Sequence, residues 1–224
     1  VPEVTIALPV YNGAGFVTDA LTAIMDQDYQ NLKIIVSDDN SADNTFAICS
    51  KFSEGKDNMT VIQNSQNIGG DGNLLRILKG CESEYFVWAC QDDTWSPNFV
   101  SELVACLESD PKLVLAQGRV TLVNESGPFK EISFLNRWNP NHLTKYGVLN
   151  CLLLPINKLQ PVKYNIFVHG VLRTSVFRSA FVHKYWVGGH DRVYMMLMAL
   201  LGRWGYVDNV DYCRRVDVGS DLRK

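Results

Sequence analysis

The sequence lacks several features that mark particular classes of protein. Its six cysteines form no Cys-x-x-Cys pair and lie mostly in apolar runs, which favours buried free thiols in a reducing compartment, although an even number also permits disulfides. The longest apolar run, Tyr194–Leu201, is far shorter than the roughly 20 residues of a membrane-spanning helix. With a formal net charge of −3, the chain has no overall basic field that would attract nucleic acid.

The remaining composition is that of an ordinary soluble globular protein, with 46% hydrophobic and 20% charged residues. We expect its 224 residues to form a single domain with a regular half, 1–118, and a more irregular half, 119–224. We expect no signal peptide, because the sequence opens almost directly on an expected strand. We therefore expect a cytoplasmic protein, and flanking sequence that could attach it peripherally to the inner face of a membrane.

Strand-like and helix-like segments alternate in the regular half. Short runs rich in β-branched or aromatic residues predict strands at Val4–Leu8, Lys33–Ser37, Met59–Gln63, Tyr85–Ala89 and Leu113–Gln117. Apolar residues at helical spacing predict helices between them, and Ser96 followed by Pro97 predicts the start of the last of these. This alternation predicts an α/β fold, with a mostly parallel sheet covered by helices on both faces.

The rhythm changes in the second half. Arg119–Val123 is expected to be one more strand, and residues 128–165 are expected to be loop-rich because four prolines interrupt them. A helix is expected again at Val193–Leu201. The second half is therefore predicted to be the less regular part of the domain.

Polar or glycine-rich segments follow four successive predicted strands. These segments are Pro9–Gly13, Asp38–Asp43, Asn64–Gly70 and Cys90–Asp93. If the strands are parallel, all four segments lie at the same edge of the sheet, where such folds bind ligands. This coincidence carries more weight than any one segment taken alone.

Each of these segments also has a purely structural interpretation. Asp38–Asp43 could be a turn with a helix cap, and Asn67–Gly70 a plain turn that enters a helix. Asp92 and Asp93 are harder to explain in this way, because a helix cap needs one acceptor and Ser96 already supplies it. A metal ion or a cationic ligand is the favoured interpretation of this pair, since carboxylate oxygens are the usual ligands of hard divalent ions.

In their order and spacing, five segments resemble family 2 glycosyltransferases of the GT-A fold. The matching text is LPVYNG (8–13), VSDDNSADNT (36–45), NIGGDGN (67–73), WACQDDTW (88–95) and GGHDRVY (188–194). The segment SDPKLVLAQG (109–118) also looks like the family sequence that follows the acid pair. The resemblance covers nearly the whole chain, and five segments in order are far more specific than any one of them.

The resemblance implies that residues 1–118 bind a nucleotide-sugar, most often a UDP-sugar. Tyr11 matches the position that packs against the base, and Pro9 adjoins it. Asp39 matches the acid that accepts a hydrogen bond from uracil. Gly69 and Asn73, in the third segment, are implied to belong to the same donor site.

The resemblance also implies a metal ion and a general base. Asp92 and Asp93 match the acid pair that touches the ribose and holds Mn²⁺ or Mg²⁺ on the diphosphate, with Asp93 as the direct ligand. Asp191 matches the base that takes a proton from the acceptor hydroxyl, although it could equally cap a helix. The implied reaction is inverting transfer to a saccharide or lipid-linked acceptor in polysaccharide or glycoconjugate synthesis, with residues 119–224 on the acceptor side.

Two departures from the family pattern bear on these roles. The family often has an acid-any-acid arrangement, whereas Cys90 and Gln91 precede the pair here, and a thiol is a poor ligand for Mg²⁺ or Mn²⁺. The base motif is commonly Glu-Asp and here is His190-Asp191. A non-catalytic module that binds a nucleotide-sugar is therefore the alternative function.

Two other classes of protein, receiver-type signalling domains and sugar nucleotidyltransferases, fit the sequence less well. A receiver-type domain would carry its acid pair after the first strand and an aspartate after the third, but here the pair follows the second strand and Asn64 follows the third. A sugar nucleotidyltransferase needs a basic, glycine-rich loop after the first strand, and Tyr11–Gly15 contains no Lys or Arg.

Overall fold

Strands and helices alternate through the first half of the chain, as predicted. The computed structural model describes residues 1–124, 127–132, 169–181 and 190–216. The first strands are β1 (Val4–Val10), β2 (Leu32–Asp38), β3 (Met59–Gln63) and β4 (Tyr85–Trp88). The helices between them are α1 (Val17–Met25), α2 (Thr45–Ser53) and α3 (Gly70–Gly80).

The sheet is mixed, with a parallel part formed by these four strands. The strand order is β3-β2-β1-β4-β8-β6-β9-β5, with β7 paired to β6, and β1 runs parallel to both β2 and β4. The later strands are β5 (Thr94–Trp95), β6 (Leu113–Asn124), β7 (Gly127–Ile132), β8 (Val171–Arg173) and β9 (Arg203–Arg215). The predicted α/β class with a mostly parallel sheet is confirmed.

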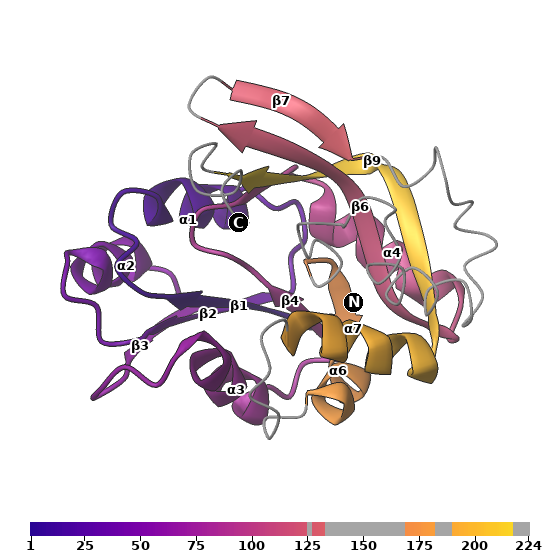
Figure 1. The fold of residues 1–224 in the computed structure, drawn as a ribbon, viewed down its shortest axis with the longest axis horizontal. Coiled ribbons are helices and arrows are strands. Elements are labelled where there is room, and N and C mark those ends of the chain that lie inside the picture. Colours follow the sequence, from indigo (N-terminus) through magenta and orange to yellow (C-terminus); the bar gives the residue numbers. More distant parts are fainter. Residues whose placement is uncertain (125–126, 133–168, 182–189, 217–224) are drawn as a thin grey trace, which may run out of the picture.

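Helices cover both faces of the parallel part. Figure 1 shows α1 and α2 on one face, and α3, α6 (Thr174–Ala180) and α7 (His190–Leu201) on the other. The alternation of side chains along β1 explains this, because Val4, Ile6 and Leu8 pack in the cluster that includes α1, while Ala7 packs in the cluster that includes α3. Strands covered on both faces read as continuous apolar runs, which is why the sequence predicted them well.

Four expectations about boundaries were wrong. Helix α4 (Phe99–Ser109) begins after Asn98, and Ser96 does not cap it. The Ser96 hydroxyl instead accepts a hydrogen bond from the backbone N–H of Asp211, since β5 pairs with β9 and holds the chain there. The expected strand Arg119–Val123 is the second part of one long strand, β6.

The other two differences lie further along the chain. Residues 127–132 form a strand although Pro128 lies in it, which is possible because β7 pairs with β6 alone among the described strands. Helix α7 begins at His190, three residues before the start that was expected. Most of the predicted loop-rich segment, 133–165, lies outside the described residues. None of the helices described is both long and apolar enough to cross a membrane.

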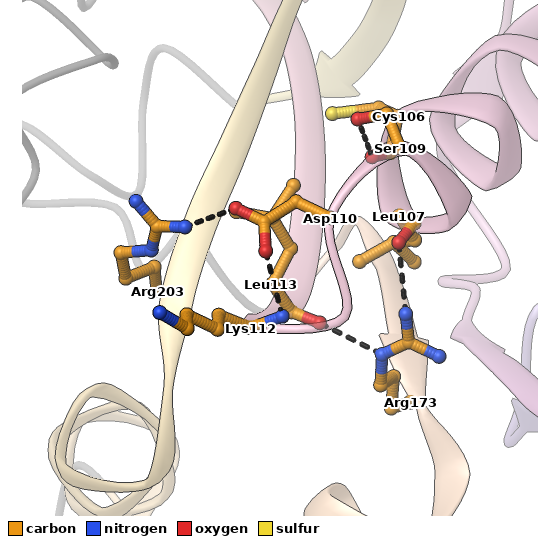
Figure 2. Close-up of polar contacts among 8 residues, drawn as sticks. All are labelled: Cys106, Leu107, Ser109, Asp110, Lys112, Leu113, Arg173 and Arg203. Carbon is orange, nitrogen blue, oxygen red and sulfur yellow. Dashed lines mark hydrogen bonds and ion pairs between the residues drawn. The ribbon is translucent and has the colours of Figure 1, made fainter.

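Arg173 joins the two parts of the sheet at the end of β8. Its guanidinium donates to the carbonyls of Leu113 and Leu107, both at 2.8 Å, and to the hydroxyl of Tyr85 at 3.0 Å. Figure 2 shows the two carbonyl contacts beside the ion pair of Arg203 with Asp110. Because a guanidinium is a rigid fork with five N–H donors, one side chain satisfies acceptors from three elements at once.

We predict that Arg173→Lys lowers the free energy of unfolding by about 1–3 kcal/mol, because a single ammonium cannot reach the carbonyls of Leu107 and Leu113 together. Arg203→Lys is the matched control, since 48% of the Arg203 side chain is exposed and its ion pair with Asp110 should contribute less than about 1 kcal/mol. Urea titrations of both variants measure the two values. Equal losses would contradict the special role of Arg173.

Candidate active site

The loop after β1 is hydrogen-bonded along its length to the loop after β2. The contacts are Asn12 N to Ser41 Oγ (2.9 Å), Ala42 N to Asn12 Oδ1 (2.8 Å), Gly13 N to Thr45 Oγ1 (2.8 Å) and Ala14 N to Asp43 Oδ2 (3.1 Å). Asn12 has a left-handed φ of 47°, which asparagine tolerates better than most residues. The two loops therefore form one connected unit at the carboxyl edge of the sheet.

The first acid of the first pair, Asp38, builds a turn. It is fully buried, and its carboxylate accepts the hydroxyl and the N–H of Ser41 at 2.5 and 3.0 Å, and the side-chain amide of Gln63 at 3.0 Å. These contacts are those of a turn that tethers the ends of two neighbouring strands. For Asp38, the described contacts are those that the structural interpretation of this segment predicts.

The second acid, Asp39, holds the loop after β3. The residue is 2% exposed, and its Oδ1 accepts hydrogen bonds from the Asn64 side-chain amide at 2.7 Å and the N–H of Ile68 at 2.9 Å. Its Oδ2 accepts the N–H of Gly69 at 2.9 Å. Gly69 has a φ of 81°, which glycine adopts without strain, so this loop can turn its amides toward the carboxylate.

Asn73 holds the same loop through hydrogen bonds to Asn64 and Ser37. It lies in α3 and is 1% exposed, and its amide donates to the carbonyl of Ser37 at 2.7 Å while its oxygen accepts from Asn64 at 3.0 Å. Arg76 donates in turn to Asn64. The resemblance assigns Asp39 and Asn73 to the donor site. In the structure, both side chains hydrogen-bond to Asn64 and help to hold the loop after β3.

Tyr11 is an exposed aromatic residue of the edge, with 47% of its surface accessible. It follows β1, in which Pro9 lies opposite Ser37 of β2. Its backbone is paired with the side chain of Gln91: the N–H of Tyr11 donates to Gln91 Oε1 at 2.8 Å, and Gln91 Nε2 donates to the Tyr11 carbonyl at 3.1 Å. Tyr11, the residue expected to pack against the nucleotide base, is thus accessible. Its backbone is held by Gln91, which lies in the loop of the acid pair.

The two acids of the second pair differ in environment. Asp92 is partly exposed, whereas Asp93 is 3% exposed and both of its oxygens accept hydrogen bonds. Its Oδ2 accepts from the hydroxyl of Tyr212 at 2.5 Å, and its Oδ1 accepts from the N–H of Arg215 at 2.9 Å. Burial and the neighbouring charge of Asp92 raise the pKa of Asp93 to about 6.

The two carboxylates of this pair suit a divalent cation. Ligand atoms of Cys90, Asp92 and Asp93 all lie within 4.8 Å of one another. The carboxylates match Mg²⁺ or Mn²⁺, and each oxygen of Asp93 retains a lone pair beside its hydrogen bond. The thiol does not match these ions, and burial and the two carboxylates raise the pKa of Cys90. Cys90 Sγ instead lies 3.8 Å from Nδ1 of His169, a buried ring whose pKa is lowered by burial to about 4.

Strand β9 supplies contacts that the sequence analysis did not predict. Besides its bond to Asp93, Arg215 donates to the carbonyl of Asp92 at 3.4 Å and to the carboxylate of Asp19 at 3.3 Å, and lies over the Phe16 ring at 5.2 Å. The acid pair is therefore held by the end of a strand more than a hundred residues further along the chain. The sequence signal for these contacts is weak: Tyr212, Cys213 and then two arginines, in a run of mixed polarity.

The proposed base, Asp191, lies in the first turn of α7, which is consistent with its expected place at a helix start. Its side chain, that of His190 and the residues 182–189 before them lie outside the described residues. So does most of the expected acceptor side. The described part of this edge thus comprises the exposed Tyr11, the two acid pairs and the contacts of β9.

Sequence comparison matches residues 5–178 to the family described as glycosyl transferase family 2. A glycosyltransferase of Rickettsia felis, whose function is uncharacterised, is 32% identical over 157 residues, which are 69% of this chain and 25% of that protein. The dTDP-rhamnosyl transferase RfbG of Shigella flexneri is 32% identical over 105 residues, 45% of this chain and 36% of that one. The chain thus spans only about a quarter of the length of the rickettsial relative.

Solved structures share the fold. A fragment of Staphylococcus aureus TarS in complex with UDP-GlcNAc has a TM-score of 0.75 at 17% identity, over 98% of this chain and 60% of that one. The mannosyltransferase PcManGT of Pyrobaculum calidifontis, in complex with GDP-Man and Mn²⁺, has a TM-score of 0.68 at 20% identity. The match covers 98% of this chain and 58% of that one. The edge loops, the α/β fold and the match over more than half of the sequence lead to one conclusion: the chain belongs to glycosyltransferase family 2 and has a GT-A-type fold.

Proposed function

We propose that this chain is a glycosyltransferase domain that moves a sugar from a nucleoside diphosphate to an acceptor hydroxyl, with inversion at the anomeric carbon. One observation carries the proposal: exposed Tyr11 and the acid pair Asp92–Asp93 lie on joined loops at the carboxyl edge of the parallel part of the sheet. Family membership supports it, as do the fold neighbours in complex with UDP-GlcNAc or with GDP-Man and Mn²⁺.

On the donor side, we propose that the base of the nucleotide packs against Tyr11, with Pro9 beside it. Asp39 keeps one lone pair on Oδ2 that could accept a hydrogen bond from uracil, since its other contacts go to the loop after β3. Gly69 and Asn73 then act by holding that loop in place. A uracil or thymine base is favoured, and a dTDP-sugar is the second candidate because one relative is named a dTDP-rhamnosyl transferase.

On the diphosphate side, Asp93 is proposed as the ligand of Mn²⁺ or Mg²⁺, and Asp92 as the contact to the ribose. A cation bound there would supply positive charge that offsets the charge developing on the leaving diphosphate. Tyr212 and Arg215 orient the Asp93 carboxylate through one hydrogen bond to each oxygen. A carboxylate fixed in this way needs little reorganisation when the donor binds.

On the acceptor side, Asp191 is proposed as the general base. The acceptor hydroxyl attacks the anomeric carbon as the bond to the diphosphate breaks, and its proton passes to the Asp191 carboxylate. Direct displacement of this kind inverts the anomeric centre. The acceptor is proposed to be a saccharide or a lipid-linked saccharide of polysaccharide or glycoconjugate synthesis.

A non-catalytic nucleotide-sugar-binding module of the same fold is the alternative. It is motivated by His190 standing where the family commonly has Glu. Turnover of a nucleotide-sugar panel beside a binding assay separates the two proposals, because a module would bind a donor without releasing nucleoside diphosphate.

The metal assignment is tested by thermal stabilisation with UDP, with and without Mn²⁺. Asp93→Asn should lose the part of the thermal stabilisation that depends on Mn²⁺, since a tenfold loss of affinity lowers the stabilisation by about 1.4 kcal/mol at saturation. Asp19→Asn is the control, because it removes a nearby carboxylate with a side chain that is 65% exposed and lies outside the proposed ligand set. An unchanged Mn²⁺ effect in Asp93→Asn would remove Asp93 from the metal site.

The catalytic role is tested by Asp191→Asn, which keeps the shape and most of the capping ability of aspartate but cannot take a proton. Turnover should fall by at least ~10²-fold, while donor affinity changes by less than about threefold. A residue that only caps α7 would be replaced well by asparagine, and activity would then stay near that of the unmutated protein. Initial rates and donor titrations measure the two quantities.

A further inference from the structure

Gln91 links the loop of Tyr11 to the loop of the acid pair. It follows β4 by three residues, while Tyr11 follows β1, the parallel neighbour of β4. Its side-chain amide accepts the N–H of Tyr11 at 2.8 Å and donates to the carbonyl of Tyr11 at 3.1 Å. One side chain thus satisfies both polar groups of the Tyr11 backbone, in the way that a neighbouring strand would.

The side-chain amide of Gln91 packs directly against Gly13. A Cβ atom added to Gly13 would lie 2.5 Å from both Cδ and Oε1 of Gln91, far inside van der Waals contact. The φ of Gly13 is outside the left-handed region, so its backbone does not itself require glycine. The absence of a side chain at position 13 is therefore explained by the place that the Gln91 amide occupies.

The contact requires an amide. In an acid-any-acid pattern that ends at Asp93, the first acid would stand at position 91. A carboxylate there could accept the Tyr11 N–H, but it has no hydrogen to donate and would set its second oxygen against the Tyr11 carbonyl. Glutamine at this position is thus a specific solution for holding the Tyr11 backbone, and costs the site one candidate metal ligand.

We propose that Gln91 is a positioning residue that couples recognition of the nucleoside at Tyr11 to binding of the cation and diphosphate at Asp92 and Asp93. This inference rests on the proposed function. Gln91 acts through the backbone of Tyr11 rather than through substrate. Because Gln91 joins the two loops, a ligand that orders one loop also orders the other. The nucleoside and the cation should therefore increase each other's affinity.

The test measures the affinity of a nucleoside diphosphate by calorimetry, with and without Mn²⁺. The probe is whichever of UDP, dTDP and GDP binds the unmutated protein most tightly. Gln91→Glu keeps the length of the side chain but loses the donor, and Gly13→Ala keeps Gln91 but displaces its amide. Both should weaken binding by about fivefold or more and should reduce the factor by which Mn²⁺ tightens it.

A double-mutant cycle tests whether Gln91 affects nucleotide affinity through Tyr11. If Gln91 acts through Tyr11, then Gln91→Ala should add little to the loss of affinity already caused by Tyr11→Ala. Fully additive losses would overturn the proposal. So would a Gln91→Glu protein whose affinity and Mn²⁺ factor equal those of the unmutated protein.

Gln27→Ala is the matched control for a purely structural effect. Gln27 is another glutamine that bridges backbone groups, since it donates to the carbonyls of Ala23 and Ser96 and accepts the N–H of Val100. Its loss should lower stability without changing nucleotide affinity or the Mn²⁺ factor. A change in the Mn²⁺ factor equal to that of Gln91→Ala would assign the effect to general loosening and contradict the coupling.

Amide hydrogen exchange at Tyr11 separates this inference from the proposed function, because it needs no nucleotide. Exchange should be faster in Gln91→Ala than in the unmutated protein, and unchanged in Gln27→Ala. Equal rates in all three proteins would reject the contact itself. If the unmutated protein binds none of the nucleotides while exchange responds as expected, the proposed function fails, and the coupling fails with it.

Discussion

The parallel pairing of β1 with β2 and β4 is the constraint on which the rest of the site depends. Parallel strands end at the same edge, so the loops that follow them must meet, and each loop leaves backbone groups that need partners. Here the loops supply these partners to one another through Asn12, Asp39 and Gln91. The many polar residues at this edge are therefore both the scaffold and the source of the proposed ligands.

The acid pair depends on a second constraint, which comes from the far end of the chain. Strand β9 runs beside β5 and β6 and brings Tyr212 and Arg215 to the two oxygens of Asp93. These bonds oppose the effect of burial and of Asp92, which together raise the pKa of Asp93. Like charges at adjacent positions are thus tolerated because β9 supplies the donors, and a cation would relieve the remaining repulsion.

The sequence predicted the fold and the edge well because both leave local signals. Apolar runs of strand length and helical spacing identify the elements, and the polar segments after four strands identify the edge. Side-chain contacts between distant loops leave no such signal, so the inward contacts of Asp39 and Asn73 and the link from Gln91 to Tyr11 were not foreseen. Ser96 misled for the same reason, because its partner Asp211 lies in β9.

The central claim is that one edge of the sheet holds the donor, with the base at Tyr11 and the diphosphate at the acid pair. A crystal structure of the chain with UDP and Mn²⁺ tests it most directly. The account predicts the uracil ring against Tyr11, the metal ion bound to the Asp93 carboxylate, and the Gln91 amide still paired with the Tyr11 backbone. A nucleotide bound away from this edge, or a metal ion that Asp92 and Asp93 do not touch, would contradict it.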